Sequence, residues 1–220
     1  MGVTEDRHRA WRAAGAAAAA LVQPGDRVGL GTGRAAGEGI LGLGARVREG
    51  LTCSGVATSA RSVELAREHG IPVGPLTGPL DIAFDGADAV DPRGLMVKGG
   101  GGALVRERIV ARAATRWIVL VDDPKMVSGL DEWGTLPIAV VPFAAEAVAH
   151  RLEDLAPTPR DQPSDDALTI IDLSPPAGSD WEAVADRAAS LAGVVDHGLF
   201  RAPLSDVFVG HADGTWSPAG

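Results

Sequence analysis

Three segments of the chain combine glycine with charged or hydroxyl side chains, the residue types that hold and activate small polar molecules. The first is Gly29–Gly37, the second is Asp85–Asp88, and the third is Lys98–Glu107. Each lies at the end of a short apolar run that predicts a strand, and two of them lead into a predicted helix. In a parallel sheet such positions gather at the carboxyl edge of the strands, where ligands bind.

The third segment carries the strongest indication of catalysis. Four consecutive glycines are costly in backbone entropy, and they are useful where several N–H groups must point at one developing negative charge. Lys98 precedes this loop, and Glu107 lies about one turn into the helix that follows. Alternatively, Glu107 is a surface residue paired with Arg106 or Arg108. The glycines are Gly99, Gly100, Gly101 and Gly102.

The second segment places two carboxylates, Asp85 and Asp88, three residues apart at the end of a strand. Such a pair can bind sugar hydroxyls, assist proton transfer or contribute to a metal site. No histidine stands at a suitable spacing to complete a metal site. The alternative is a solvated turn in which Asp88 caps its own backbone.

The first segment predicts an anion site, because glycines at a strand-to-helix turn expose backbone N–H groups at a helix N-terminus. Its spacing differs from that of a P-loop and only loosely resembles a dinucleotide fingerprint. A tight turn without a ligand is the alternative. The candidate binding residues are Gly31, Thr32, Gly33 and Arg34.

Lysine is rare in this chain, since only Lys98 and Lys125 occur among 20 basic residues. Arginine occupies nearly every other cationic position. A retained lysine indicates a place that needs a compact ammonium, which a planar guanidinium does not imitate. Chance is the alternative, because two residues are few.

Together these groups supply a carboxylate base, an ammonium, a cradle of N–H groups and two hydroxyl-binding aspartates. Interconversion of an aldose and a ketose needs this set, because a proton leaves the carbon beside the carbonyl and returns to the adjacent carbon. The enediolate formed between those steps needs fixed donors. The chemistry requires no redox cofactor.

Composition narrows the class of protein. The formal charge of −9 argues against nucleic-acid binding, and no apolar run reaches the ~18 residues of a membrane span. Cys53 is the single cysteine, so no disulfide forms within the chain and a reducing cytoplasm is expected.

The pattern of strands and helices predicts an α/β fold with a Rossmann-like, doubly wound and mostly parallel sheet. We expect this domain over residues 1–130 and 199–220, and a smaller α+β lobe over residues 131–198. Strands are predicted at 27–30, 52–57, 81–84, 95–97 and 117–121, with helices at 4–21, 35–47, 60–69 and 103–114. The lobe is predicted to have strands at 138–141, 168–173 and 194–196 and helices at 144–155 and 180–191, and 205–209 is predicted to return to the main sheet.

In order and spacing, the motifs resemble the ribose-5-phosphate isomerase type A family over nearly the whole chain. The segments that carry the resemblance are Val28–Gly33, Thr58-Ser59, Asp85–Asp88, Val97–Glu107, Val121–Lys125 and Gly193–Phe200. The resemblance implies a Rossmann-like domain with a small α+β lobe. It also implies a sugar phosphate substrate, no metal or organic cofactor, and a homodimer or homotetramer.

The resemblance also implies roles for individual residues. Glu107 matches the family's general base, and Lys98 with the glycines after it matches the group that stabilises the enediolate. Asp85 and Asp88 match carboxylates that hold the sugar hydroxyls and help to open the ring. Lys125 matches a lysine near the substrate phosphate. Thr58 and Ser59, which belong to a matching segment, are further candidate substrate-binding residues.

The chain departs from the family pattern at the phosphate end. The usual Gly-Thr-Gly-Ser-Thr is Gly31–Ala35 here, with Arg34 and Ala35 in place of the two hydroxyl residues, and the usual lysine of the first helix falls at Trp11-Arg12. Ala89 replaces a glutamate, and the lobe reads Pro137–Val140 without its usual glutamate. Arg34 could clamp a phosphate, bind another acidic group or close the pocket around a different sugar.

Three other functions stay open at this point. The first is an isomerase for another sugar or sugar acid, and the second is a non-catalytic sugar-phosphate sensor. The third is a nucleotide-dependent oxidoreductase, which lacks the acidic ribose contact expected ~20 residues after the glycine loop.

Overall fold

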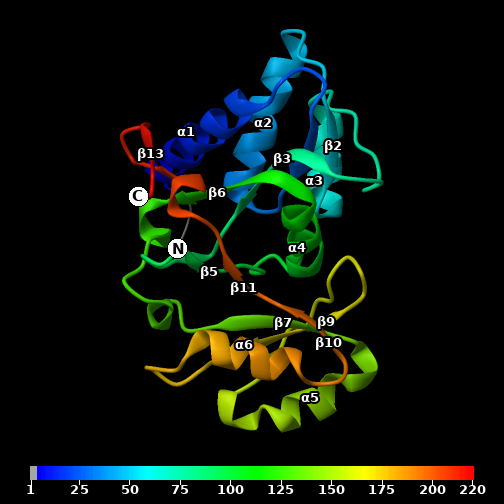
Figure 1. Ribbon diagram of the computed structural model, residues 1–220, viewed down its shortest axis with the longest axis vertical. Helices are drawn as coiled ribbons and strands as arrows, with labels where there is room; N and C mark the ends of the chain where they lie inside the picture. Colours follow the sequence, from blue (N-terminus) through cyan, green and yellow to red (C-terminus); the bar gives the residue numbers. More distant parts are fainter. Residues whose placement is uncertain (1–3) are drawn as a thin grey trace. The chain divides into compact units, whose positions relative to one another are not determined.

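A six-stranded sheet forms the framework of the first of two units (Figure 1). The computed structural model describes residues 4–220. The strand order is β13-β12-β6-β3-β1-β2, and every neighbouring pair is parallel except β12 with β13. The strands are β1 (Arg27–Leu30), β2 (Ser54–Ala57), β3 (Leu80–Gly86), β6 (Ala114–Asp122), β12 (Val207–Gly210) and β13 (Trp216–Pro218).

Helices cover both faces of this sheet, as the alternation of its buried residues requires. Phe84 of β3 points into a core formed with α1 (Glu5–Leu21), α2 (Arg34–Arg48) and α3 (Ala60–Glu68). The next residue back, Ala83, points to the opposite face and packs with Val110 of α4 (Leu104–Ala113). The doubly wound arrangement predicted from the sequence is therefore confirmed.

The first helix is fixed at its start and packs closely on the sheet. Thr4 caps α1 by accepting a hydrogen bond from the Arg7 N–H, and Glu5 and Asp6 complement the helix dipole. Figure 1 shows α1 alongside α2. Where α1 crosses β12, a Cβ atom on Gly210 would lie 1.9 Å from the Ala10 carbonyl oxygen, so only glycine permits this approach.

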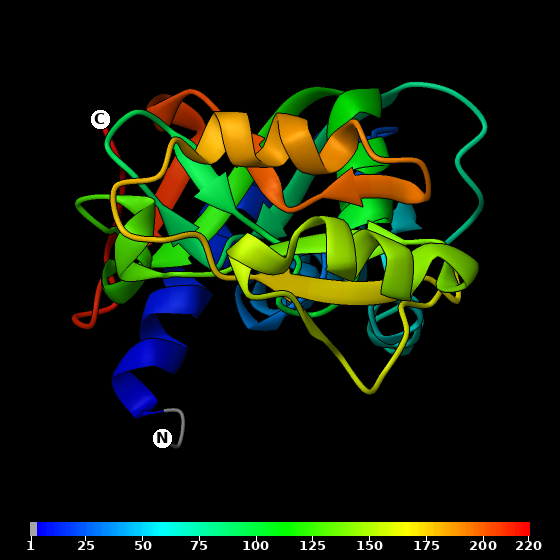
Figure 2. The same ribbon diagram turned by 90° about the horizontal axis from the view of Figure 1, so that it is seen from below.

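The second unit contains two antiparallel sheets. One has the order β10-β7-β9-β8, and the other has the order β11-β5-β4. Helices α5 (Ala145–Arg151) and α6 (Trp181–Ala189) share one apolar core with the four-stranded sheet, and Figure 2 shows them side by side along it. The strands are β4 (Ala89–Val90), β5 (Leu95–Val97), β7 (Leu136–Val140), β8 (Thr158–Pro159), β9 (Thr169–Leu173), β10 (Val194–His197) and β11 (Leu199–Arg201).

One predicted strand was assigned to the wrong sheet. The sequence placed residues 95–97 in the main parallel sheet, whereas β5 pairs antiparallel with β4 and β11. The reason is that its partner β11 lies about a hundred residues further along the chain and gives no local signal. The predicted helix 144–155 is also shorter, since α5 ends at Arg151 and a separate turn of 3₁₀ helix covers Glu153–Leu155.

The two units are interleaved in sequence. The first runs to Gly86 and includes Arg106–Lys125 and Ala202–Gly220, and the second comprises Ala87–Val105 and Met126–Arg201. Residues 87–105, which the sequence grouped with the first domain, thus join the second unit by their contacts. The predicted domain began at residue 1, and residues 1–3 lie outside the described part of the chain. Among residues 4–220, no helix has the length and apolar character to cross a bilayer.

We predict that Gly210→Ala destabilises the first unit by about 1–3 kcal/mol, because overpacking against backbone forces the helix away from the strand. Chemical denaturation followed by circular dichroism measures this change. Gly74→Ala is the matched control, since a Cβ atom there meets nothing within 4 Å, and its effect should stay within about 1 kcal/mol. Equal stability of Gly210→Ala and wild type would contradict the close packing of α1 on β12.

Candidate active site

The first glycine segment forms the turn between β1 and α2, and a buried aspartate holds it. The Thr32 N–H donates to Asp85 Oδ1 at 2.9 Å, and the Gly86 N–H donates to the same oxygen at 2.7 Å. Asp85 is 3% exposed. Two amide donors stabilise its charge in place of water.

Close approach between this turn and β3 explains its glycine. A Cβ atom on Gly31 would lie 2.2 Å from Asp85 Oδ1 and 2.5 Å from its Cα. The Asp85 carboxylate therefore occupies the space that a side chain at position 31 would need.

Two further predicted binding residues support this turn. The Thr32 and Thr58 hydroxyls share a hydrogen bond of 2.7 Å, and the Thr58 hydroxyl also donates to the Leu30 carbonyl at 3.2 Å. Ser59 caps α3 by accepting from the Ser62 N–H. Thr58 is fully buried, so its hydroxyl acts within the fold and through Thr32.

Glu107 lies in the first turn of α4 and is 4% exposed. The surface position that the alternative interpretation gave Glu107 is therefore wrong. A carboxylate in a first helical turn is favoured by the helix dipole. Burial also removes it from bulk water, which is the condition under which a carboxylate becomes an effective proton acceptor.

Lys98 is also buried, at 2% exposed, directly after β5. Its backbone N–H donates to the Gly198 carbonyl at 2.8 Å, and its side-chain Nζ lies 5.6 Å from the centroid of the Phe200 ring. An ammonium is rarely buried this deeply without a role. Its position at the start of the glycine loop is as predicted.

The glycine loop is a tight turn that Asp88 holds from one side. The Gly102 N–H donates to the Gly99 carbonyl at 2.9 Å, and the Gly100 N–H donates to Asp88 Oδ2 at 2.8 Å. A Cβ atom on Gly100 would lie 2.7 Å from the Asp88 carboxylate. The Asp88 side chain thus contacts the glycine loop, twelve residues away.

Two arginine side chains, those of Arg7 and Arg34, lie over the ring of Trp11. Trp11 belongs to the Trp11-Arg12 pair that stands where the family pattern has a lysine. The guanidinium carbon of Arg7 lies 5.1 Å from the centroid of the Trp11 ring, and that of Arg34 lies 5.8 Å from it. Trp11 is buried at 4% exposed, whereas Arg34 is exposed. Within residues 4–220, Arg34 forms no ion pair. Its charge therefore remains available to an anion.

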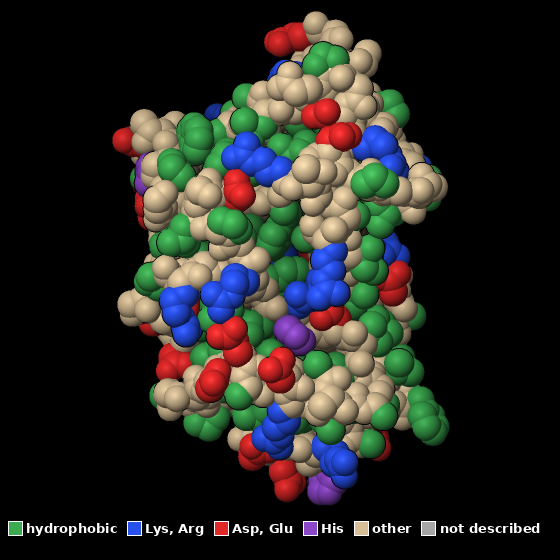
Figure 3. Space-filling model, viewed as in Figure 1, with side chains coloured by type: hydrophobic (Ala, Val, Ile, Leu, Met, Phe, Trp, Pro, Cys, Tyr) green, Lys and Arg blue, Asp and Glu red, His purple; other side chains and the backbone are tan. Residues whose placement is uncertain are grey.

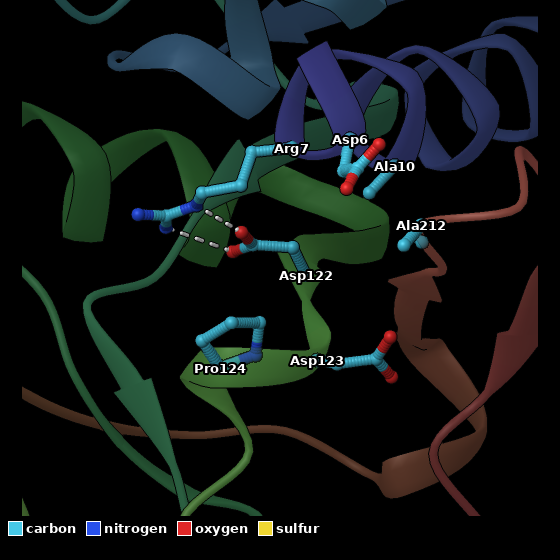
Figure 4. Close-up of a pocket in the computed structure, with 8 residues that line it drawn as sticks. Asp6, Arg7, Ala10, Asp122, Asp123, Pro124 and Ala212 are labelled. Atoms are coloured by element: carbon cyan, nitrogen blue, oxygen red, sulfur yellow. Dashed lines mark hydrogen bonds and ion pairs between the residues drawn. The ribbon is translucent and has the colours of Figure 1, made fainter. Parts of the chain in front are cut away.

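Arg7 is held differently, by a buried carboxylate that sequence analysis missed. Its Nε donates to Asp122 Oδ2 at 2.6 Å and its Nη2 to Oδ1 at 3.3 Å, as the dashed lines in Figure 4 show. Both residues line a pocket between α1 and the ends of β6 and β12. Asp122 ends the apolar strand β6, and a carboxylate at the end of a buried strand was the sequence signal that could have identified it. Lys125 follows Pro124, which also lines this pocket, and belongs to the turn Asp123–Lys125.

The predicted site residues divide between the two units. Gly31, Thr32, Gly33, Arg34, Thr58, Ser59, Asp85, Glu107 and Lys125 belong to the first unit, whereas Asp88, Lys98, Gly99, Gly100, Gly101 and Gly102 belong to the second. Basic side chains lie in several separate groups with acidic ones between them on the face in Figure 3. Local cationic sites therefore coexist with a net charge of −9. Across residues 4–220, no cluster of three His, Cys, Asp or Glu side chains could hold a metal ion.

A family model described as ribose 5-phosphate isomerase A (phosphoriboisomerase A) matches residues 54–214. The chain belongs to the ribose 5-phosphate isomerase A family. Ribose-5-phosphate isomerase A of Thermomicrobium roseum is 43% identical in an alignment 228 positions long, which covers 97% of this chain and 93% of the relative. The corresponding protein of Deinococcus radiodurans is 43% identical, with 89% of this chain and 91% of the relative covered.

Solved structures of the family share the fold. Ribose 5-phosphate isomerase A of Methanocaldococcus jannaschii has a TM-score of 0.86 and 32% identity, covering 94% of this chain and 97% of that one. A D-ribose-5-phosphate isomerase in complex with phospho-erythronic acid has a TM-score of 0.85 and 30% identity, covering 99% and 98%. The family and the fold class predicted from the sequence are both confirmed.

We predict that Arg7→Met destabilises the protein by about 1–3 kcal/mol, because it removes the donors of a buried carboxylate. Denaturant unfolding measures the loss. Arg9→Met is the control, since Arg9 pairs with Asp6 where the two side chains are 47% and 62% exposed, and its other hydrogen bond, to the Ala212 carbonyl, is also exposed. Its effect should stay within about 0.5 kcal/mol. The same small effect from both variants would show that Asp122 does not depend on Arg7.

Proposed function

We propose that the chain interconverts ribose 5-phosphate and ribulose 5-phosphate through an enediolate, with Glu107 as the base. The activity follows from family membership. The observation that carries the assignment of the base is the burial of Glu107 at 4% exposed, in the helix that directly follows the lysine and glycine loop.

The reaction needs one carbon-bound proton to move between neighbouring carbons. In the open-chain aldose, Glu107 takes the proton from C2, and the electron pair forms the C1–C2 double bond as the C1 carbonyl becomes an oxyanion. The hydroxyl proton moves from O2 to O1, and protonated Glu107 returns its proton to C1 to give the ketose. Atoms and electrons balance without a redox partner.

Lys98 and the glycine loop stabilise the negative charge on the enediolate oxygen. A buried ammonium interacts strongly with an anion because little water screens it. Fixed N–H groups add to this effect because they need no reorganisation as the charge develops. Asp85 and Asp88 hold sugar hydroxyls and assist ring opening, in addition to the loop contacts that they make.

At the other end of the substrate, Arg34 holds the phosphate together with Lys125 and the Gly33 N–H, since the Gly31 and Thr32 N–H groups of this turn already donate to the Phe84 carbonyl and to Asp85. The turn precedes α2, whose N-terminal dipole favours an anion. The guanidinium supplies two parallel donors in place of the two missing hydroxyl residues. Contact with the Trp11 ring restricts the position of the Arg34 guanidinium group.

The second candidate is an isomerase for another sugar with an acidic terminal group, and the same Arg34–Trp11 arrangement favours it. Arginine binds carboxylates as well as phosphates in this bidentate manner. A homodimer or homotetramer remains a prediction, which light scattering after size-exclusion chromatography tests.

We predict that Glu107→Gln lowers kcat by about two to four orders of magnitude, because an amide cannot accept the proton. The measurement is conversion of ribose 5-phosphate to ribulose 5-phosphate without added metal. Glu64→Gln is the control for charge and shape, since Glu64 is exposed on α3, and it should keep wild-type turnover. Unchanged turnover by Glu107→Gln would refute the assignment of the base.

We predict that Arg34→Ser raises the KM for ribose 5-phosphate by about 10- to 100-fold, the effect of losing hydrogen bonds to a charged group, with little change in kcat. Arg67→Ser, at an exposed position of α3, is the control and should leave KM unchanged. The variant and wild type should be equally inefficient on ribose without phosphate. A KM unaffected by Arg34→Ser would show that Arg34 does not contact the phosphate.

A further inference from the structure

Arg160, which lies outside every motif found in the sequence, contacts the glycine loop. It follows β8, and its N–H donates to the Ile170 carbonyl at 2.8 Å. Its Nε and Nη2 donate to the two carboxylate oxygens of Asp172 in β9, both at 2.7 Å. This bidentate pair fixes the plane of the guanidinium.

The remaining donor group of Arg160 binds two consecutive carbonyl oxygens of the loop. Nη1 donates to the Gly99 oxygen at 2.8 Å and to the Gly100 oxygen at 3.1 Å. Arginine suits this task because its donors form a rigid fork. A lysine at the same position could not pair with both Asp172 oxygens and reach both carbonyls.

These contacts determine the directions in which the C=O and N–H groups of two peptide units, Gly99–Gly100 and Gly100–Gly101, point. In a trans peptide, the C=O of one residue and the N–H of the next point in opposite directions. The Gly99–Gly100 unit is therefore held on both sides, by Arg160 at its carbonyl and by Asp88 at its N–H, each at 2.8 Å.

The next peptide unit, Gly100–Gly101, is held on one side only. Arg160 takes the Gly100 carbonyl, so the Gly101 N–H points away from the guanidinium. Within residues 4–220 this N–H donates to no acceptor, and Gly101 is exposed. An oriented donor that the fold does not use is available to a ligand.

We propose that Arg160, anchored by Asp172, is a positioning residue that aims the Gly101 N–H at the enediolate oxygen. The inference rests on the proposed function and names the group that preorganises its oxyanion site. Four glycines in sequence have no intrinsic preference for one orientation. Arg160 supplies that preference from outside the loop, so the donor is in place before charge develops.

The test compares Arg160→Lys, Arg160→Ala and Asp172→Asn with a matched pair elsewhere in the same unit. Arg187 binds both oxygens of Asp154, at 2.6 and 2.7 Å, and donates to the Arg151 carbonyl at 2.9 Å. Arg187→Ala therefore removes the same kind of interaction without touching the loop. Melting temperatures of all variants report the purely structural cost.

Two inhibitors separate the oxyanion from the rest of the substrate. Phospho-erythronic acid carries a carboxylate, which places negative charge where the enediolate develops it. Ribitol 5-phosphate carries only neutral hydroxyls at that end. Inhibition constants for both compounds are measured beside kcat and KM for ribose 5-phosphate, with wild type and Glu107→Gln in the same series.

We expect the Arg160 variants to lower kcat by about 10- to 100-fold, somewhat less than outright loss of an oxyanion donor, with KM changed less than about threefold. Affinity for phospho-erythronic acid should fall by a similar factor and affinity for ribitol 5-phosphate should not. The kcat of Asp172→Asn and its affinity for phospho-erythronic acid should lie between those of wild type and Arg160→Ala. Arg187→Ala should match wild type in both quantities. Wild-type kcat in the Arg160 variants, or equal loss of affinity for both inhibitors, would overturn the inference.

Failure of the proposed function has a different signature. If wild type does not convert ribose 5-phosphate, that function is refuted, and the ratio of the two inhibition constants then decides only whether Arg160 orients the Gly101 N–H toward an anion. If wild type is active and the Arg160 variants equal it, only the role of Arg160 is refuted.

Discussion

Burial of charge is the constraint on which the rest of this structure depends. Asp85, Lys98 and Glu107 are each less than 5% exposed, and a charge removed from water is stable only where hydrogen bonds or opposite charges replace the lost hydration. Backbone amides do this for Asp85. Glycine is needed opposite the aspartates because a side chain at Gly31 or Gly100 would occupy the space of the Asp85 or Asp88 carboxylate.

The two ends of the proposed substrate site follow different chemistry. At the reaction end, the residue types match the family pattern, since proton transfer and oxyanion stabilisation tolerate few substitutes for a carboxylate and an ammonium. At the phosphate end, an anion needs only positive charge and donors, and several arrangements supply them. Here an exposed arginine lies against a buried tryptophan, and a second arginine is tied to Asp122. Such freedom is consistent with a chain in which arginine has replaced lysine nearly everywhere.

Sequence analysis predicted most helices and the parallel strands, because the periodicity of apolar residues is a local signal. It placed β5 in the wrong sheet, because pairing with β11 depends on residues about a hundred positions away. Burial of Glu107 was equally hidden, since a glutamate in a first helical turn has the same local sequence whether buried or exposed.

The contacts that sequence analysis missed are those between side chains distant in the chain. Arg7 and Asp122 are 115 residues apart, and Arg160 reaches a loop 60 residues before it. Nothing in either neighbourhood distinguishes these arginines from the others. Only tertiary structure shows which carbonyl or carboxylate each one binds.

The most direct test of this account is a crystal structure of the protein with phospho-erythronic acid. We expect the phosphate on Arg34, and the carboxylate within about 3 Å of Lys98 Nζ and the Gly101 N–H, with the Glu107 carboxylate facing the adjacent carbon. A phosphate bound away from Arg34, or a carboxylate that contacts neither Lys98 nor the glycine loop, would contradict it.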